Sequence, residues 1–195
     1  MPGGDTAGFM VGKKKESGKI RLMTLKTVPY VPAPDIIVAD LLKRAEAGPG
    51  DVLCDLGSGD GRILIKAVED FNVSQAIGYE IRQDLYQSSL REVRQRNLQE
   101  RITIYHQDFH QAAISVASVV ALYLSPDANE SLRAKFEQEL RAGTRVVSLA
   151  FSISQWQGDD YFYGDYQEYP KVFQADELDR FQYPIYKYLI PDAFN

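Results

Sequence analysis

Residues 51–61, Asp-Val-Leu-Cys-Asp-Leu-Gly-Ser-Gly-Asp-Gly, constrain the fold of this chain more than any other stretch. The first half is a short apolar run around Asp55, which is typical of a buried parallel strand. Three glycines at alternate positions end this run, and the apolar residues at 63–65 and 67–68 predict a short, largely buried helix. A strand, a glycine turn and a helix in this order open a nucleotide-binding βαβ unit.

The spacing of the glycines distinguishes between two kinds of cofactor. A dinucleotide fold uses G-x-G-x-x-G to receive a pyrophosphate, whereas this loop reads G-x-G-x-G. Asp55 precedes the first glycine by two residues and Asp60 lies inside the loop, so two carboxylates would repel a pyrophosphate. They suit a ligand that carries an ammonium group beside a sulfonium, and the loop therefore predicts binding of S-adenosylmethionine (SAM). The purely structural alternative is a tight turn in which Asp60 caps the helix.

Composition and charge limit the class of protein. The chain has 195 residues, of which 45% are hydrophobic and 25% charged, as in one soluble globular domain. It contains no apolar run of membrane-spanning length, no apolar core of a signal peptide, and a single cysteine, Cys54. We therefore expect a cytoplasmic protein without a membrane span. The net charge of −5 argues against extensive coating of nucleic acid, and no stable nucleic-acid complex is expected.

The pattern along the chain predicts a Rossmann-like, doubly wound α/β fold. Further helices are expected over residues 35–47 (capped by Asp35), 82–98 and 126–141. Further strands are expected over residues 75–80, 102–105, 117–124 and 144–151, and two more over 172–174 and 183–189 would form a C-terminal antiparallel hairpin. This gives a mostly parallel seven-stranded sheet with helices on both faces. Residues 1–27 are expected to be a flexible tail or arm, 28–195 one domain, and 152–169 a mobile substrate-facing loop.

Acidic residues follow the next two predicted strands. Glu80 ends a strand 25 residues after Asp55, where nucleotide-binding folds place an acid that accepts hydrogen bonds from ribose hydroxyls. Asp108 follows the third strand and could accept a hydrogen bond from an adenine amino group, and Phe109 could stack on the ring or enter the core. His106 and His110 lack a third ligand, so loop histidines are expected and no metal site is predicted.

Several motifs together resemble one family. The glycine loop, residues 55–62, is similar to that of class I, seven-β-strand SAM-dependent methyltransferases. The similarity narrows to the non-SET protein-lysine methyltransferases of archaea and their mitochondrial relatives, over about residues 28–157. The motifs that indicate this narrower group are Tyr30-Val31-Pro32-x-Pro34, Gly50-Asp51, Gly78-x-Glu80, Tyr123-Leu124-x-Pro126, Gly143-Thr144-Arg145-Val146-Val147-Ser148 and Trp156.

The resemblance implies roles for matching residues. Asp55 and the loop glycines would contact the methionine moiety, Glu80 the ribose, and Asp108 with Phe109 the adenine. Tyr30 would lie near the methionine carboxylate or the target channel. Where relatives usually have threonine this chain has Ala33, so a hydroxyl contact to the cofactor is missing. The predicted cofactor-binding residues are Tyr30, Asp55, Gly57, Ser58, Gly59, Asp60, Glu80, Ile81, Asp108 and Phe109.

The expected reaction is methyl transfer from SAM to an amine nitrogen, the ε-amino group of lysine in protein substrates, with S-adenosylhomocysteine as the other product. Tyr30, Tyr123 and Trp156 are the candidate catalytic residues, and the last two are candidates to line the acceptor channel. Tyr123 lies at the end of the fourth predicted strand, where open α/β sheets bind ligands, and would face the reactive end of the cofactor unless it packs into the core. The sequence Tyr123-Leu124-Ser125-Pro126 differs from the Asp/Asn-Pro-Pro-Tyr/Phe motif of enzymes that methylate amino groups of adenine or glutamine, which argues against a nucleic-acid acceptor.

Three alternatives remain open. The chain could methylate a small molecule or another acceptor, or it could be a SAM-binding regulator or scaffold without transfer activity. A nicotinamide oxidoreductase is disfavoured by Asp55 and by the loop spacing.

Overall fold

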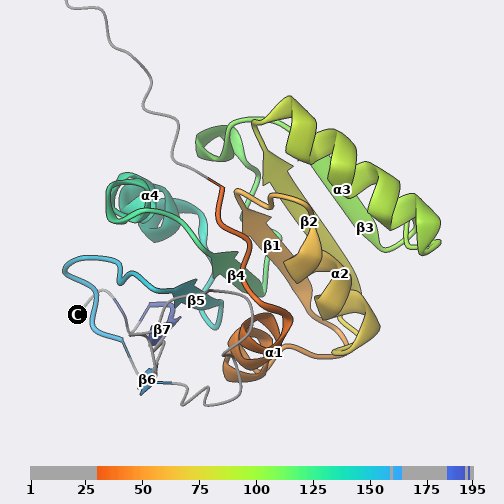
Figure 1. The fold of residues 1–195 in the computed structure, drawn as a ribbon. Coiled ribbons are helices and arrows are strands. Elements are labelled where there is room, and N and C mark those ends of the chain that lie inside the picture. Colours follow the sequence, from red (N-terminus) through yellow and green to blue (C-terminus); the bar gives the residue numbers. More distant parts are fainter. Residues whose placement is uncertain (1–29, 159, 164–183, 192, 194–195) are drawn as a thin grey trace, which may run out of the picture.

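The strands form one sheet with the order β3-β2-β1-β4-β5-β7-β6 (Figure 1). The structure is a computed structural model, and it describes residues 30–158, 160–163, 184–191 and 193. The strands are β1 (Val52–Leu56), β2 (Gln75–Glu80), β3 (Ile102–His106), β4 (Val119–Leu122), β5 (Arg145–Leu149), β6 (Asp160–Tyr163) and β7 (Pro184–Leu189). The helices are α1 (Asp35–Arg44), α2 (Arg62–Glu69), α3 (Gln83–Gln95), α4 (Pro126–Glu139) and the 3-10 turn η1 (Phe109–Gln111). No described helix is long and apolar enough to cross a membrane.

The strand pairing defines where a ligand can bind. Strands β3, β2, β1, β4 and β5 are parallel, and β7 pairs antiparallel with both β5 and β6. The chain leaves β1 toward β2 and β3 on one side and returns to β4 and β5 on the other. Open α/β sheets bind ligands at this reversal, outside the carboxyl ends of the strands. The carboxyl edge at β1 and β4 is therefore the place to look for the site.

Apolar side chains bury both faces of the sheet. Leu53 of β1 and Val147 of β5 belong to a core shared with α1, α2 and α3. The adjacent residues along the same two strands, Cys54 and Val146, point to the other face and join a second core with α4. Alternation along the strands thus produces the two layers of helices expected of a doubly wound fold.

The Rossmann-like fold is confirmed, with a mostly parallel sheet, an antiparallel C-terminal hairpin and helices on both faces. The hairpin contains β7 as predicted, but its first described strand is β6, inside the stretch expected to be a loop. The strand expected at 172–174 and the tail at 1–27 lie outside the described residues.

Two local predictions are wrong. Asp35 is the first residue of α1 rather than its cap, and Pro34 takes the cap position with no side-chain hydrogen bond. His106 is not in a loop, because pairing with β2 extends β3 to include it.

Candidate active site

The glycine loop after β1 adopts a backbone that other residues rarely adopt. Gly57, Gly59 and Gly61 have φ values of +80°, +56° and +84°. A Cβ on Gly57 would lie 2.8 Å from Leu124 Cδ2, and one on Gly59 would lie 2.5 Å from Tyr30 Cε2. Both the left-handed conformation and the close approach of neighbours therefore require glycine at these two positions.

Glu80 at the end of β2 holds this loop in place. Its side chain is buried, and Oε2 accepts a hydrogen bond from the Gly59 N–H at 2.8 Å. Oε1 accepts another from the Arg82 N–H at 2.7 Å. Each carboxylate oxygen has a second lone pair, so Glu80 can still accept hydrogen bonds from a ribose. Sequence reasoning assigned Glu80 to the ribose and missed its contact to the loop.

Asp55 is a buried acid among other acids. It is 2% exposed, and its Oδ2 has no hydrogen-bond partner among the described residues. Burial raises the pKa of Asp55 to about 8, and the charges of Glu80 and Asp60 add to this shift. The Ser58 Oγ is likewise buried without a partner in the described part of the chain. Two unpaired polar groups in an acidic loop fit a cationic ligand with hydrogen-bond donors, as SAM is, and fit a pyrophosphate poorly.

Asp60 pairs with Arg62, and its Oδ1 also accepts a hydrogen bond from the Arg62 backbone N–H, at the first residue of α2, at 3.3 Å. Gly61 is the cap residue, without a side-chain hydrogen bond. The Asp60 carboxylate accepts hydrogen bonds from the Arg62 guanidinium at 2.6 and 3.0 Å and from the Tyr30 hydroxyl. Burial by itself would raise the pKa of Asp60, but Arg62 and Tyr30 outweigh it and hold this pKa below its ordinary value. Burial, with the Asp60 charge, raises the pKa of Tyr30 to about 12, so the phenol stays neutral.

Ala33, the departure from the family pattern, is buried in the segment before α1. Ala33 is 3% exposed, and its carbonyl accepts a hydrogen bond from Arg62 Nη1 at 2.7 Å. Its backbone therefore ties the segment before α1 to the start of α2.

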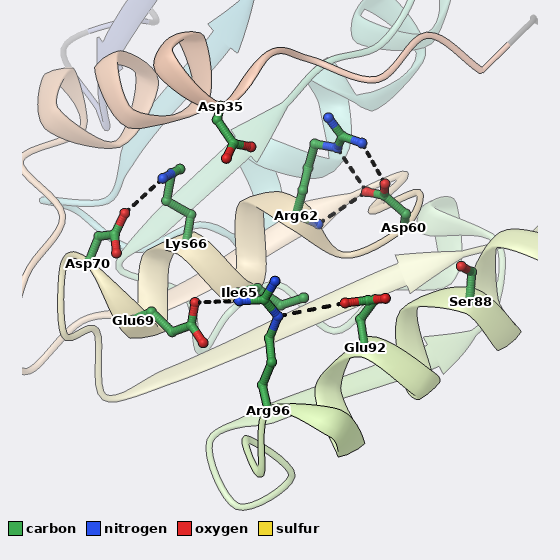
Figure 2. A pocket seen from close by; sticks show the side chains of 10 residues that line it. All are labelled: Asp35, Asp60, Arg62, Ile65, Lys66, Glu69, Asp70, Ser88, Glu92 and Arg96. Carbon is green, nitrogen blue, oxygen red and sulfur yellow. Dashed lines mark hydrogen bonds and ion pairs between the residues drawn. The ribbon is translucent and has the colours of Figure 1, made fainter.

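A pocket of about 310 Å³ lies on the helical face beside this loop, between α1, α2 and α3 (Figure 2). Most of its charged side chains pair with one another, as Figure 2 shows for Arg96 with Glu69 and Glu92 and for Lys66 with Asp70. It is lined by Asp35, Asp60, Arg62, Ile65, Lys66, Glu69, Asp70, Ser88, Glu92 and Arg96. Neither Asp55 nor Glu80 lines it, so it is distinct from the acidic site at the strand ends.

The predicted adenine-binding residues follow β2 and β3. Asp108 caps η1, and its Oδ1 accepts hydrogen bonds from the His110 N–H and Nδ1 at 2.9 and 2.8 Å. Burial would raise the pKa of Asp108, but the His110 hydrogen bonds hold it below its ordinary value. Phe109 packs against the second core, and Ile81 is 62% exposed beside Glu80. An exposed apolar side chain next to a carboxylate can form the wall of an adenine site.

Tyr123 and Trp156 have different environments. Tyr123 follows β4 and packs, partly buried, against the first core. Trp156 is 8% exposed in the second core, where its ring lies 5.9 Å from Phe136 and 5.4 Å from Tyr188. The Trp156 indole N–H donates to Glu137 of α4 at 3.1 Å. This packing makes Trp156 a core residue, and its place in an acceptor channel stays a prediction.

Among the described residues, no group of three or more His, Cys, Asp or Glu side chains is placed to hold a metal ion. The glycine loop, Glu80 and Asp55 thus stand as an acidic cofactor site at the carboxyl ends of β1 and β2.

Comparison with known proteins places the chain in a family. Residues 55–160 match the model of the ANTKMT methyltransferase domain. A protein-lysine N-methyltransferase of Saccharolobus islandicus is 42% identical over 129 residues, which are 66% of this chain and 80% of that protein. The adenine nucleotide translocase lysine N-methyltransferase of Mus musculus is 31% identical over 130 residues, 67% of this chain and 56% of that protein. The chain thus spans little more than half of the mouse relative.

A solved structure supports the same assignment. The RNA methyltransferase from Salinibacter ruber, in complex with S-adenosylhomocysteine, superposes with a TM-score of 0.71 at 32% identity. The match covers 83% of this chain and 95% of that one. SAM is accordingly the cofactor for which the acidic glycine loop is built. The chain belongs to the ANTKMT methyltransferase domain family and is a class I SAM-dependent methyltransferase.

Proposed function

We propose that this enzyme transfers the methyl group of SAM to the ε-amino group of lysine in protein substrates. The observation that supports the acceptor most directly is the 42% identity to the archaeal protein-lysine N-methyltransferase across 80% of that protein. The mouse relative is also named for a lysine acceptor in a protein. The buried acid pair Asp55 and Glu80 beside the glycine loop supports the cofactor half of the proposal.

The chain's own residues would bind and orient rather than exchange protons with the cofactor. SAM supplies an activated methyl group, and its transfer leaves S-adenosylhomocysteine. Asp55 and Ser58 would bind the methionine end through their unpaired oxygens, and Glu80 would accept hydrogen bonds from the ribose. Asp108 and Ile81 would hold the adenine. A cation beside Asp55 favours its carboxylate form, so binding would lower the raised pKa of this group.

The acceptor amine must be neutral for its lone pair to attack the methyl carbon. An unperturbed lysine has a pKa of about 10.4, so a lysine in water is almost entirely charged at neutral pH. Entry into a site beside a bound sulfonium lowers the pKa of the amine, because both desolvation and the like charge disfavour the ammonium form. The amine proton leaves to solvent before attack, and alignment of the nitrogen with the methyl carbon provides most of the acceleration.

A nucleic-acid acceptor is the second candidate, because the Salinibacter ruber structure, 32% identical to this chain, carries the name RNA methyltransferase. The net charge of −5 and the absence of the Asp/Asn-Pro-Pro-Tyr/Phe motif favour the protein acceptor. We place the activity in the cytoplasm as part of the same proposal. Its support is the single cysteine, Cys54, which is buried and cannot form an intramolecular disulfide.

Transfer of labelled methyl groups from SAM into a lysate of the source organism tests the acceptor. Wild-type enzyme is compared with Asp55→Asn, and the exposed Glu100→Gln at the opposite edge of the sheet is the matched control. We expect label in protease-sensitive bands, recovered as methyl-lysine and greatly reduced in Asp55→Asn alone. Label that RNase removes instead would replace the lysine acceptor with RNA. SAM binding without any labelled product would leave a scaffold as the function.

A further inference from the structure

The carboxyl edge of β4 and β5 carries an exposed aromatic residue that sequence reasoning missed. The cofactor residues follow β1, β2 and β3, so an acceptor approaching across the strand reversal would lie over the carboxyl ends of β4 and β5. Leu122 of β4 pairs with Ser148 of β5, and each of these strands ends within one residue of that pair. Phe151 follows β5 by two residues and is 42% exposed. It therefore lies at the same edge as Tyr123.

The backbone that carries Phe151 has an uncommon conformation. Ala150, immediately before it, has a φ of +70°, and Gln155 a φ of +66°. Residues with a Cβ adopt this region rarely, and they do so where the surrounding structure imposes it. The exposure of Phe151 is therefore a built feature of the turn after β5.

A fully buried asparagine on α4, Asn129, binds this turn. The Asn129 Nδ2 donates to the Phe151 carbonyl at 3.0 Å, to the Ser152 carbonyl at 3.4 Å and to the Ser148 Oγ at 3.1 Å. The Ser148 hydroxyl in turn donates to the Phe151 carbonyl at 2.6 Å. Asn129 is 0% exposed, and its Oδ1 has no partner among the described residues. Burying an amide whose oxygen has no hydrogen-bond partner costs free energy. The hydrogen bonds that the Asn129 Nδ2 donates to the turn offset this cost and hold the turn to α4.

The rest of α4 continues the attachment of this segment. Glu130 accepts a hydrogen bond from Ser154, and Arg133 Nη1 donates to Gln155 Oε1 at 2.9 Å. Together with the Trp156 contact to Glu137, these bonds secure residues 151–156 along successive turns of the helix. This part of the stretch 152–169, which the sequence predicted to be a mobile loop, is thus hydrogen-bonded to α4. Residues 151–156 have no regular secondary structure, but these hydrogen bonds hold the backbone at Phe151 in one position.

We propose that Phe151 binds the aliphatic stem and ammonium group of the target lysine and that Asn129 is its positioning residue. This inference rests on the proposed lysine acceptor. An aromatic face attracts a cation and also packs on the methylene groups of a long side chain. Phe151 would contact the acceptor and not the cofactor, whose predicted residues are on the other half of the sheet.

The test measures kcat and KM for poly-L-lysine as methyl acceptor, together with SAH affinity by calorimetry. Phe151→Ala is expected to raise KM for poly-L-lysine about tenfold and to leave SAH affinity unchanged, while Phe151→Tyr keeps KM within about twofold. Val116→Ala removes an equally exposed apolar side chain from the turn before β4, at the opposite edge, and is the matched control. Asn129→Ala and Ser148→Ala are expected to raise KM in the same direction.

If Asn129→Ala does not fold, the surface variants at Phe151 still decide the matter. An active wild type with an unchanged KM in Phe151→Ala would overturn the inference and leave the proposed function intact, as would a loss confined to kcat. A wild-type enzyme that binds SAH but methylates neither poly-L-lysine nor any lysine-containing protein would overturn both.

Discussion

Asp55 should make the stability of the cofactor-free protein unusually sensitive to pH, and Asp55→Asn should remove that sensitivity. The folded protein raises the pKa of this carboxyl from 3.8 to about 8. Between these values the folded state holds a proton that the unfolded chain has released. Stability from this proton is complete below about pH 4 and is lost as the pH rises through about 8.

The magnitude follows from the size of the shift. About four pKa units at ~1.4 kcal/mol each give an upper bound of roughly 6 kcal/mol on the unfolding free energy lost between acidic and alkaline pH. Asparagine has the same shape and cannot ionise, so the titrating groups that do not interact with Asp55 cancel when the two proteins are compared. Relative to Asp55→Asn, the wild type should therefore lose several kcal/mol of unfolding free energy between pH 5 and pH 9.

Urea denaturation of both proteins at pH 5, 7 and 9, without cofactor, measures this difference directly. An excess of SAM should reduce it, because a cation beside the carboxylate stabilises the ionised form. Parallel pH profiles for the wild type and Asp55→Asn would refute the reasoning, since they would mean that Asp55 is already ionised at pH 5. Glu100→Gln, an exposed change at the far edge of the sheet, should follow the wild-type profile.

Three further substitutions distinguish residues that bind the cofactor from residues that stabilise the fold by packing. Glu80→Gln should weaken SAM binding by tenfold or more in calorimetry, because it removes the carboxylate that accepts the Gly59 N–H and that we expect to accept the ribose hydroxyls. Gly59→Ala should abolish SAM binding and cost ~1–2 kcal/mol in urea denaturation, because its φ of +56° disfavours a Cβ that would also strike Tyr30. Trp156→Phe should cost ~1–3 kcal/mol of stability, through the lost hydrogen bond to Glu137 and a smaller ring, without changing the acceptor KM.

Each of these expectations has a result that contradicts it. Unchanged SAM affinity in Glu80→Gln would remove Glu80 from the cofactor site. Normal SAM affinity in Gly59→Ala would mean that Tyr30 and the loop adjust at little cost. A raised acceptor KM in a stable Trp156→Phe would return Trp156 to the acceptor channel.

Local patterns in the sequence predicted the parallel half of the sheet closely. The apolar run ending at Leu56, the alternate glycines and the helix from Arg62 lie within twenty consecutive residues, so sequence spacing alone defines their order. The strand bounds at Gln75 and Glu80 matched because each is set by neighbouring residues. The hairpin was harder, since antiparallel pairing of β6 with β7 joins residues more than twenty positions apart.

In the cofactor site, too, the sequence predicted which residues take part, and only the folded structure shows how they interact. The residue types that suit SAM could be recognised from Asp55, the glycines and Glu80, because their spacing along the chain reflects a recurrent βαβ unit. What they do to one another depended on folding: the bond from Gly59 to Glu80, and the burial that shifts the pKa of Asp55. Neither can be read from sequence, since desolvation and charge depend on distances in space.

Long-range packing also determined which aromatic residues are buried and which are exposed. In the sequence Trp156 and Phe151 are both aromatic residues beyond the fifth strand. In the folded protein α4 draws Trp156 into the second core and, through Asn129, holds Phe151 at the surface. The sequence by itself determined the fold class and the kind of cofactor, because both follow from local periodicity and spacing. Only the tertiary structure decided which side chains are buried, paired or presented, because contacts between distant segments make that choice.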